Sequence, residues 1–215
     1  MSQIQIQWNN EDFNVFQIEG LDPRMQALIE TIRPKFNALG EYFSAYFSSH
    51  TGEEFYAHVA KHARRKVNPP TDSWVAFAPY KRGYKSLPHF QIGLWGTHLF
   101  IITAIIYEAP QKKEMAERLL TNLNVFDNLP EDFIISGDHM SPKAIPLKDA
   151  KKQELVPLLE RLRDVKKGEF IVGRHIPREE AIHLTGEQFA ALAEETFDAL
   201  LPIYKTMTNK QLVNI

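Results

Sequence analysis

The segment HFQIGLWGTHLFIITAIIYE (residues 89–108) constrains the fold most strongly. Its first half alternates between apolar and mixed side chains, and its second half carries four isoleucines, a composition that favours strand over helix. If Gly96 and Thr97 form a two-residue turn, the halves make an antiparallel hairpin in which Trp95 lies opposite His98. His89, Gln91, Gly93 and Phe100 then share the face of this pair, and the uniformly apolar opposite face is expected to be core. A three-residue turn would move His98 to the other face.

Further strands and several helices are predicted on either side of this hairpin. Strands are expected at residues 72–78, 132–139 and 169–176, from their aromatic and branched side chains. Helices are expected from Asp22-Pro23 to about Thr51-Gly52 with a kink or restart at Pro34, from Gly52 to Lys66, and after Pro110. Two more are expected from Lys148 to Val165, with an interruption at Pro157, and from the capping box at Thr185 to about Met207. We therefore expect an α+β fold, a mixed but mainly antiparallel sheet built on the central hairpin and covered by several helices. The length of 215 residues, without repeat or linker, predicts a single globular domain over residues 1–215.

The residue inventory excludes several classes of site. The absence of cysteine excludes disulfides, thiolate zinc sites, iron–sulfur clusters and a cysteine nucleophile. The sequence contains no P-loop, dinucleotide-binding or nucleophile-elbow motif, so neither a cofactor nor a metal ion is predicted. The start MSQIQIQWNNEDF resembles no secretory signal, and no apolar run is long enough to cross a bilayer. We expect a cytoplasmic protein.

The charges are distributed unevenly along the chain. The formal net charge is -2, yet residues 58–90 contain seven cations against the single acid Asp72 and carry +6, which leaves -8 for the rest. The cations are Lys61, Arg64, Arg65, Lys66, Lys81, Arg82 and Lys85. This basic segment is the most informative charge feature of the chain.

The first basic cluster lies in the string HVAKHARRKVNPP (residues 58–70). On the predicted helix His58 and His62 are one turn apart and could share a metal ion, but Val59 replaces the glutamate that the HExxH protease pattern requires. Packing against an apolar stripe explains both histidines better than a metal does. The cations that follow would complement the negative end of the helix dipole, which alone would account for them.

A second basic cluster, KRGYK (residues 81–85), follows only one predicted strand later. Arginine gives bidentate contacts to phosphate, lysine gives point charges, and tyrosine gives a stacking surface. Our main hypothesis is a binding site for an anionic ligand, namely a nucleotide, a phosphorylated metabolite or RNA. Its proposed residues are His62, Arg64, Arg65, Lys81, Arg82, Tyr84, Lys85 and His89.

Two other functions are open at this point. One is an enzyme that uses His58, His62, His89 or His98 as general acid or base on a phosphate or carboxylate substrate. The other is a structural or protein-interaction role, and the sequence leaves the oligomeric state undefined. No catalytic residue can be assigned from the sequence.

Three long strings resemble a known family. FNVFQIEGLDPRM (residues 13–25), HVAKHARRKVNPP, and WVAFAPYKRGYKSLPHFQIGLW (residues 74–95) are similar to those of the YktB-like family of uncharacterised bacterial proteins. The resemblance extends over essentially the whole chain. It implies a single α+β domain in the bacterial cytoplasm, and it carries no activity, cofactor or catalytic residue.

Overall fold

Residues 5–150 and 153–209 are described by the structure, a computed structural model. Within these residues seven strands form one sheet in the order β1-β2-β3-β4-β7-β5-β6, and every neighbouring pair is antiparallel. The strands are β1 (Tyr56–Val59), β2 (Asp72–Ala78), β3 (His89–Trp95), β4 (His98–Ile105), β5 (Phe133–Ser136), β6 (Ile145–Pro146) and β7 (Phe170–Pro177). The expected α+β fold is confirmed, with a sheet that is antiparallel at each described pairing rather than mixed.

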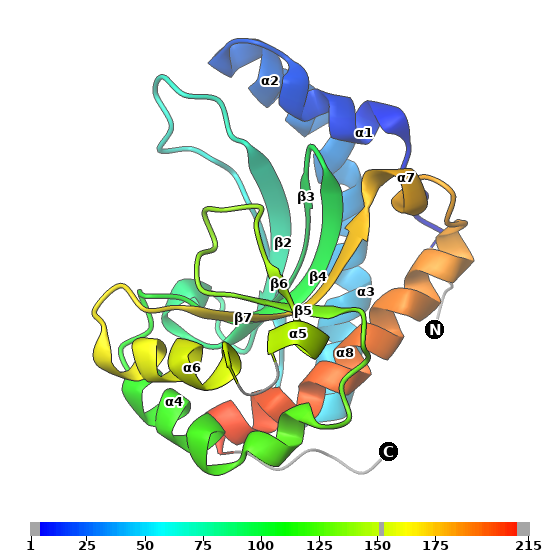
Figure 1. Cartoon of the computed structure of the whole chain (residues 1–215). Helices are drawn as coiled ribbons and strands as arrows, with labels where there is room; N and C mark the ends of the chain where they lie inside the picture. The colour runs from blue at the N-terminus through cyan, green and yellow to red at the C-terminus, as the bar shows by residue number, and fades with distance from the viewer. Residues whose placement is uncertain (1–4, 151–152, 210–215) are drawn as a thin grey trace.

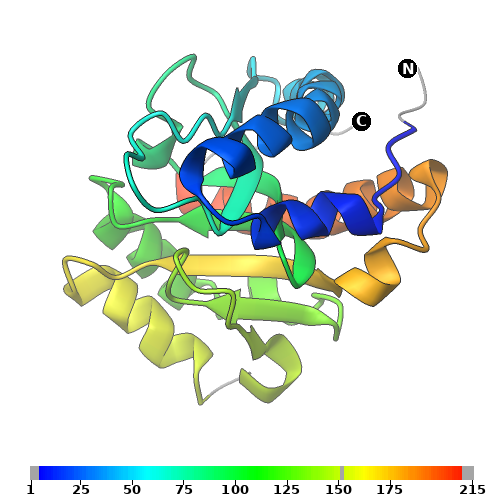
Figure 2. The same cartoon turned by 90° about the horizontal axis from the view of Figure 1, so that it is seen from above.

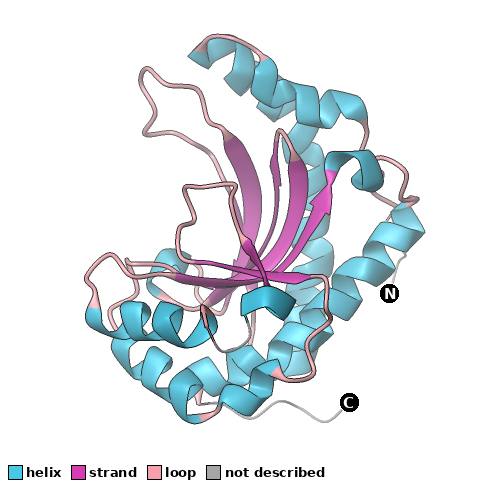
Figure 3. Cartoon of the chain, in the orientation of Figure 1, coloured by secondary structure: helices cyan, strands magenta, loops and turns pink. Residues whose placement is uncertain are grey.

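Helices lie on one face of this sheet and at its ends (Figure 3). They are α1 (Asn10–Asn14), α2 (Leu21–Ala27), α3 (Arg33–Thr51), α4 (Lys112–Thr121), α5 (Leu147–Ala150), α6 (Leu155–Asp164), α7 (Arg178–Ala181) and α8 (Gly186–Thr208). Short turns of other helix types are η1 (Val15–Gln17), η2 (Leu28–Ile32), η3 (Tyr84–Ser86) and η4 (Leu123–Phe126). No helix among the described residues combines the length and apolarity needed to cross a membrane.

The hairpin β3–β4 lies at the centre of the sheet, as predicted. Leu94 pairs with Leu99 across it, and the apolar face that contains this pair is buried. Helices α3 and α8 cover this face side by side (Figure 1 and Figure 2). The hydroxyls of Tyr42 and Tyr46 on α3 donate hydrogen bonds to Glu194 and Asp198 on α8, so the two helices are joined by polar contacts as well as by the core.

Helix α3 begins and ends at the residues predicted from the sequence. Pro34 stands in its first turn, after the π-type turn η2, so the proline restarts the helix at a position where its missing amide hydrogen costs little. At the other end, Gly52 adopts a left-handed conformation with φ of 71° and donates its amide to the carbonyl of Ser48. The helix therefore stops where the sequence indicates.

The predicted helix from Gly52 to Lys66 is wrong. Residues 56–59 form the edge strand β1, and the chain then continues as a loop to β2. The apolar residues Phe55 and Val59 are four positions apart, a spacing that fits two periods of a strand as well as one turn of a helix. Consequently His58 and His62 share no helix face, and no helix dipole faces Arg64, Arg65 and Lys66.

The other observed helices agree more closely with the predicted ones. The capping box of α8 is present, with Gln188 N donating to Thr185 Oγ1 at 3.2 Å and Thr185 N donating to Gln188 Oε1 at 2.9 Å. The helix expected from Lys148 to Val165 is divided into α5 and α6, and residues 151–152 between them lie outside the described residues. The predicted interruption at Pro157 is wrong, because this proline lies in the first turn of α6, where a proline is tolerated.

Candidate functional site

The second face of the hairpin is the floor of a pocket. The two-residue turn places Trp95 opposite His98 and Gly93 opposite Phe100, which confirms the predicted face. A second apolar cluster of five buried residues covers this face: Phe100, Ile102, Ala104, Ile106 and Ile171, flanked by Trp74 and Trp95. Gly93 makes room for it, because a Cβ atom there would lie 2.2 Å from Cζ of Phe100.

We call the pocket above this floor the aromatic pocket. Its cavity volume is about 40 Å³, and the space between its atoms reaches about 510 Å³ only when the open solvent at its mouth is counted. Its walls combine aromatic rings with polar side chains, which is the usual chemistry of a small-molecule site. The lining residues are Asp72, Trp74, Tyr84, Lys85, Gln91, Trp95, Phe100, Ile102, Ile106, Ser136, Asp138, His139, Ser141, Ile171 and His175.

A second depression, which we call the basic hollow, adjoins the aromatic pocket. It is formed by β1, the start of the loop after β1, and the KRGYK loop. The predicted site residues that line it are His62, Arg64, Arg65, Lys81, Arg82, Tyr84 and Lys85. The fold thus brings the two basic clusters to one hollow, although the helix expected to carry the first cluster is absent.

The aromatic pocket and the basic hollow share a wall made of Trp74, Tyr84 and Lys85. The indole Nε1 of Trp74 donates to the hydroxyl of Tyr84 at 2.8 Å, and Nζ of Lys85 lies 3.5 Å from a carboxylate oxygen of Glu108. Burial raises the pKa of the Tyr84 hydroxyl to about 12, so this group stays neutral. The wall presents aromatic surface and one ammonium group to both sides.

Two histidines were predicted to belong to the anion site. His62 lines the basic hollow, and His89 does not. His62 has a left-handed backbone with φ of 51°, and its Nε2 lies 3.1 Å from Oγ of Ser73. Burial, aided by the charge of Arg65, lowers the pKa of His62 to about 4. His89 is fully buried, with Nδ1 bonded to the carbonyl of Leu87 and Nε2 to the amide of Gln91. Its place in the proposed site is therefore beneath Gln91 rather than against a ligand.

The histidines considered for acid–base chemistry have no carboxylate partner among the described residues. Nε2 of His58 bonds to the carbonyl oxygen of Tyr80, and Nδ1 of His98 bonds to Oγ1 of Thr97. The ring of His98 stacks on His175 with centroids 4.1 Å apart. These contacts are those of packed rings, and they give no proton-transfer pair.

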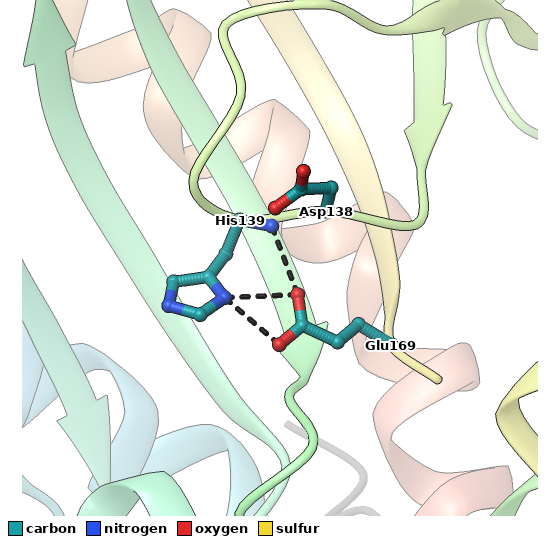
Figure 4. Close-up of side chains that lie close together, drawn as sticks. All are labelled: Asp138, His139 and Glu169. Atoms are coloured by element: carbon teal, nitrogen blue, oxygen red, sulfur yellow. Dashed lines mark hydrogen bonds and ion pairs between the residues drawn. The ribbon is translucent and has the colours of Figure 1, made fainter. Parts of the chain in front are cut away.

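A histidine that the sequence did not single out has such a partner (Figure 4). Nδ1 of His139 lies 2.8 and 2.9 Å from the two carboxylate oxygens of Glu169, and its backbone amide donates to the same carboxylate at 2.9 Å. The amide of Tyr107 adds a fourth contact at 3.3 Å. Burial acts to raise the pKa of Glu169, but the hydrogen bonds from His139 outweigh burial and hold this pKa below its usual value.

The pairing of β5 with β7 explains this contact. Ser136, at the end of β5, lies opposite Ile171 in β7, so the residues that follow Ser136 meet the residue that precedes β7. The signal in the sequence is the polar pair Asp138-His139 at the end of one predicted strand and Glu169 at the start of another. Strand pairing alone brings them together.

Asp72 is an acidic residue in the lining of the aromatic pocket. Its side chain is buried at the start of β2, and burial raises its pKa to about 6, against the opposing charges of Arg65 and His139. Asp72 thus keeps a proton under conditions in which an ordinary aspartate is ionised. Asp72 gives the pocket lining a carboxyl group whose pKa is raised, whereas Glu169, which is bonded to the lining residue His139, has a carboxyl group whose pKa is lowered.

Asp138, His139 and Glu169 also bring three potential metal-ligand atoms within 4.8 Å of one another. Both oxygens of Glu169 already accept N–H donors, and the proton on Nδ1 of His139 is needed for the shortest of these contacts. Asp138 is exposed and accepts the amide of Met140 at 2.8 Å. The geometry favours a hydrogen-bonded pair over a metal centre at this place.

Comparison with known proteins identifies the family to which this pocket belongs. Residues 8–204 match the model of a family described as "Domain of unknown function (DUF1054)". The chain belongs to the DUF1054 family. It is 65% identical over 207 residues to a UPF0637 protein of Lysinibacillus sphaericus (strain C3-41), which covers 96% of this chain and 98% of that relative. A UPF0637 protein of Bacillus cereus (strain G9842) is 53% identical over 198 residues, with 92% and 95% covered.

The resemblance to the YktB-like family is thereby confirmed. The descriptions of DUF1054 and of the UPF0637 relatives name no activity, ligand or catalytic residue. A function for the DUF1054 chain has to be argued from the aromatic pocket and the basic hollow.

Proposed function

We propose that this DUF1054 protein binds an anionic small molecule that carries both phosphate groups and a flat apolar group, as a nucleotide does. The observation that supports the proposal is the shared wall of Trp74, Tyr84 and Lys85 between an aromatic pocket and a basic hollow. A ring stacked in the pocket would place attached phosphates at the cations of the hollow. The cytoplasmic location expected from the sequence stays a prediction.

The charge distribution favours a small ligand over a polymer. The +6 segment is confined to two loops of a chain whose net charge is -2, whereas proteins that follow a nucleic-acid backbone spread their cations along a stripe. Arg64, Lys81 and Arg82 are exposed, and no ion pair to a carboxylate involves them within the described residues. Cations in this state are available to an incoming phosphate.

A thermal-shift panel tests the proposal. The panel contains nucleoside mono-, di- and triphosphates, sugar phosphates, inorganic phosphate, RNA and divalent metals, because a ligand that prefers the native state raises the melting temperature. We expect nucleotides to give the largest shift. A thermal shift with RNA alone would mean that the protein binds a polymer and not a small molecule. A shift with metals alone would contradict the proposal.

Charge reversal locates the site. Arg64→Glu together with Arg82→Glu should weaken binding of the best nucleotide by roughly a hundredfold or more, since each of the two charge-assisted phosphate contacts contributes about 1.5–3 kcal/mol. The matched control is Lys113→Glu with Lys166→Glu, which makes the same change in net charge at exposed positions outside both depressions. Equal affinity of the two double variants would show that the hollow is not the phosphate site.

A further inference from the structure

His139 of the pair His139–Glu169 lines the aromatic pocket, which the proposed ligand enters, and this position suggests more than binding. The side chain of Glu169 is only 4% exposed, whereas that of His139 is 21% exposed and lines the aromatic pocket. Because Glu169 holds Nδ1, the free ring nitrogen of His139 is Nε2, which points away from Glu169 (Figure 4). Nε2 makes no hydrogen bond to any described residue. A histidine fixed in this way has the geometry of a general base.

Asp72 lines the same pocket and is close enough to His139 for the two charges to interact. Its other charged neighbour is Arg65, which belongs to the basic hollow. The pocket therefore has a proton acceptor and a carboxyl group at the junction with the cations. Two titratable groups in different environments are the usual arrangement for acid–base catalysis.

We infer that His139, positioned by Glu169, is the general base and Asp72 the general acid of a reaction that hydrolyses a phosphate ester at this junction. The inference rests on the proposed binding function, since the phosphate must lie at Lys85, which lines both depressions. The substrate class is an aromatic or nucleoside phosphate ester. Its ring occupies the aromatic pocket, and its charge faces the hollow.

The proton and electron transfers balance without a further reactant. A water molecule gives a proton to Nε2 of His139 while its oxygen forms a bond to phosphorus. The bond from phosphorus to the ester oxygen breaks, that oxygen keeps the electron pair, and it takes the proton of the Asp72 carboxyl group. His139 then releases its proton and Asp72 takes one up, so both groups return to their starting states.

Two chromogenic or readily assayed esters test the roles separately: p-nitrophenyl phosphate and phenyl phosphate. His139→Gln should lower kcat for both esters by about a hundredfold or more, the usual contribution of a general base. Glu169→Gln should lower kcat by at least about tenfold with little change in KM, because it acts on orientation rather than on binding. The control is His183→Gln, an exposed histidine outside the pocket, which should match the wild type.

Asp72→Asn has a signature that a structural role would not produce. Nitrophenolate leaves readily without a proton, whereas phenolate needs one, so the variant should lose much more activity on phenyl phosphate than on p-nitrophenyl phosphate. The variant Arg64→Glu with Arg82→Glu should instead raise KM for both esters. An equal loss on both esters for Asp72→Asn would overturn its role as the acid.

Three results would overturn the whole inference. One is wild-type activity in His139→Gln. The second is activity that a chelator abolishes and Mn²⁺ restores, which would assign the reaction to a metal ion. The third is no hydrolysis by the wild type of either ester or of the nucleotide with the largest thermal shift. In this third case a retained thermal shift leaves the binding function standing, whereas the absence of any shift removes both.

Discussion

The indole Nε1 of Trp74 donates a hydrogen bond of 2.8 Å to the hydroxyl oxygen of Tyr84, and this bond ties together the wall between the two depressions. Tyr84→Phe removes the acceptor and keeps the ring. We expect the free energy of unfolding in urea to fall by about 1 kcal/mol, the usual net value of one such bond, and the affinity for nucleotides to fall with it. Tyr80→Phe, at a residue that is 58% exposed, is the matched control and should change neither quantity.

Asp72→Asn should stabilise the protein at neutral pH. The carboxyl pKa is about 6 in the folded state against 3.8 ordinarily, so the folded state binds the proton more tightly, and stability falls as pH rises from 3.8 to 6. Asparagine carries no charge, so the variant does not lose stability in this way. Its free energy of unfolding should exceed that of the wild type by up to about 3 kcal/mol near pH 7 and by little near pH 4. Urea unfolding at both pH values measures it.

The exposed Asp149→Asn is the control for this prediction. It should leave the free energy of unfolding unchanged at either pH. If Asp72→Asn were less stable than the wild type near pH 7, the carboxylate would be stabilising in the native state, and its assignment as a proton donor would be wrong.

The stacked pair His98–His175 should make the fold sensitive to acid. Burial lowers the pKa of His98 to about 4, and burial together with the charge of His98 lowers that of His175 to about 3, from 6.5 for both. The unfolded chain therefore binds more protons below 6.5, and stability is lost as pH falls from 6.5 toward 4. The double variant His98→Gln and His175→Gln should lose less stability over this range, by more than about 1 kcal/mol. Histidine resonances of these rings that titrate near 6.5 in the folded protein would contradict this account.

Gly93→Ala tests the floor of the aromatic pocket. Its Cβ atom would lie 2.2 Å from Cζ of Phe100 and 2.7 Å from the carbonyl oxygen of Ser73, and the backbone of a central strand cannot shift to relieve both contacts. We expect a loss of about 1–3 kcal/mol in the free energy of unfolding and a displaced Phe100 ring. Gly96→Ala, whose Cβ would meet its nearest neighbour at 3.4 Å, should be tolerated. Equal stability of the two variants would show that the floor is loosely packed.

Part of this pocket follows from local sequence patterns. The two-residue turn at Gly96-Thr97 fixes which residues of the two strands point to the same face of the hairpin. This register places Trp95, His98 and Phe100 on one face. The basic clusters at residues 64–66 and 81–85 flank one strand, so their proximity was also predictable. These features depend on short-range geometry, which the sequence carries directly.

Other parts depend on long-range pairing. The spacing of Phe55 and Val59 suits strand and helix alike, and only the pairing of β1 with the edge of β2 selects the strand. His139 and Glu169 are thirty residues apart, and their contact requires β5 to pair with β7, although β6, α5 and α6 lie between these strands in the chain. A single sequence does not specify which strands pair, and this is why the histidine with a carboxylate partner was not predicted.

Isothermal titration of three probes tests the central claim, that one ligand spans the aromatic pocket and the basic hollow. The probes are ADP, adenosine and inorganic pyrophosphate, each titrated into the wild type, Trp74→Leu, and Arg64→Glu with Arg82→Glu. We predict that both variants lower the affinity for ADP. Only Trp74→Leu should lower the affinity for adenosine, and only the charge reversal should lower the affinity for pyrophosphate. Binding of ADP that neither variant weakens would contradict the account.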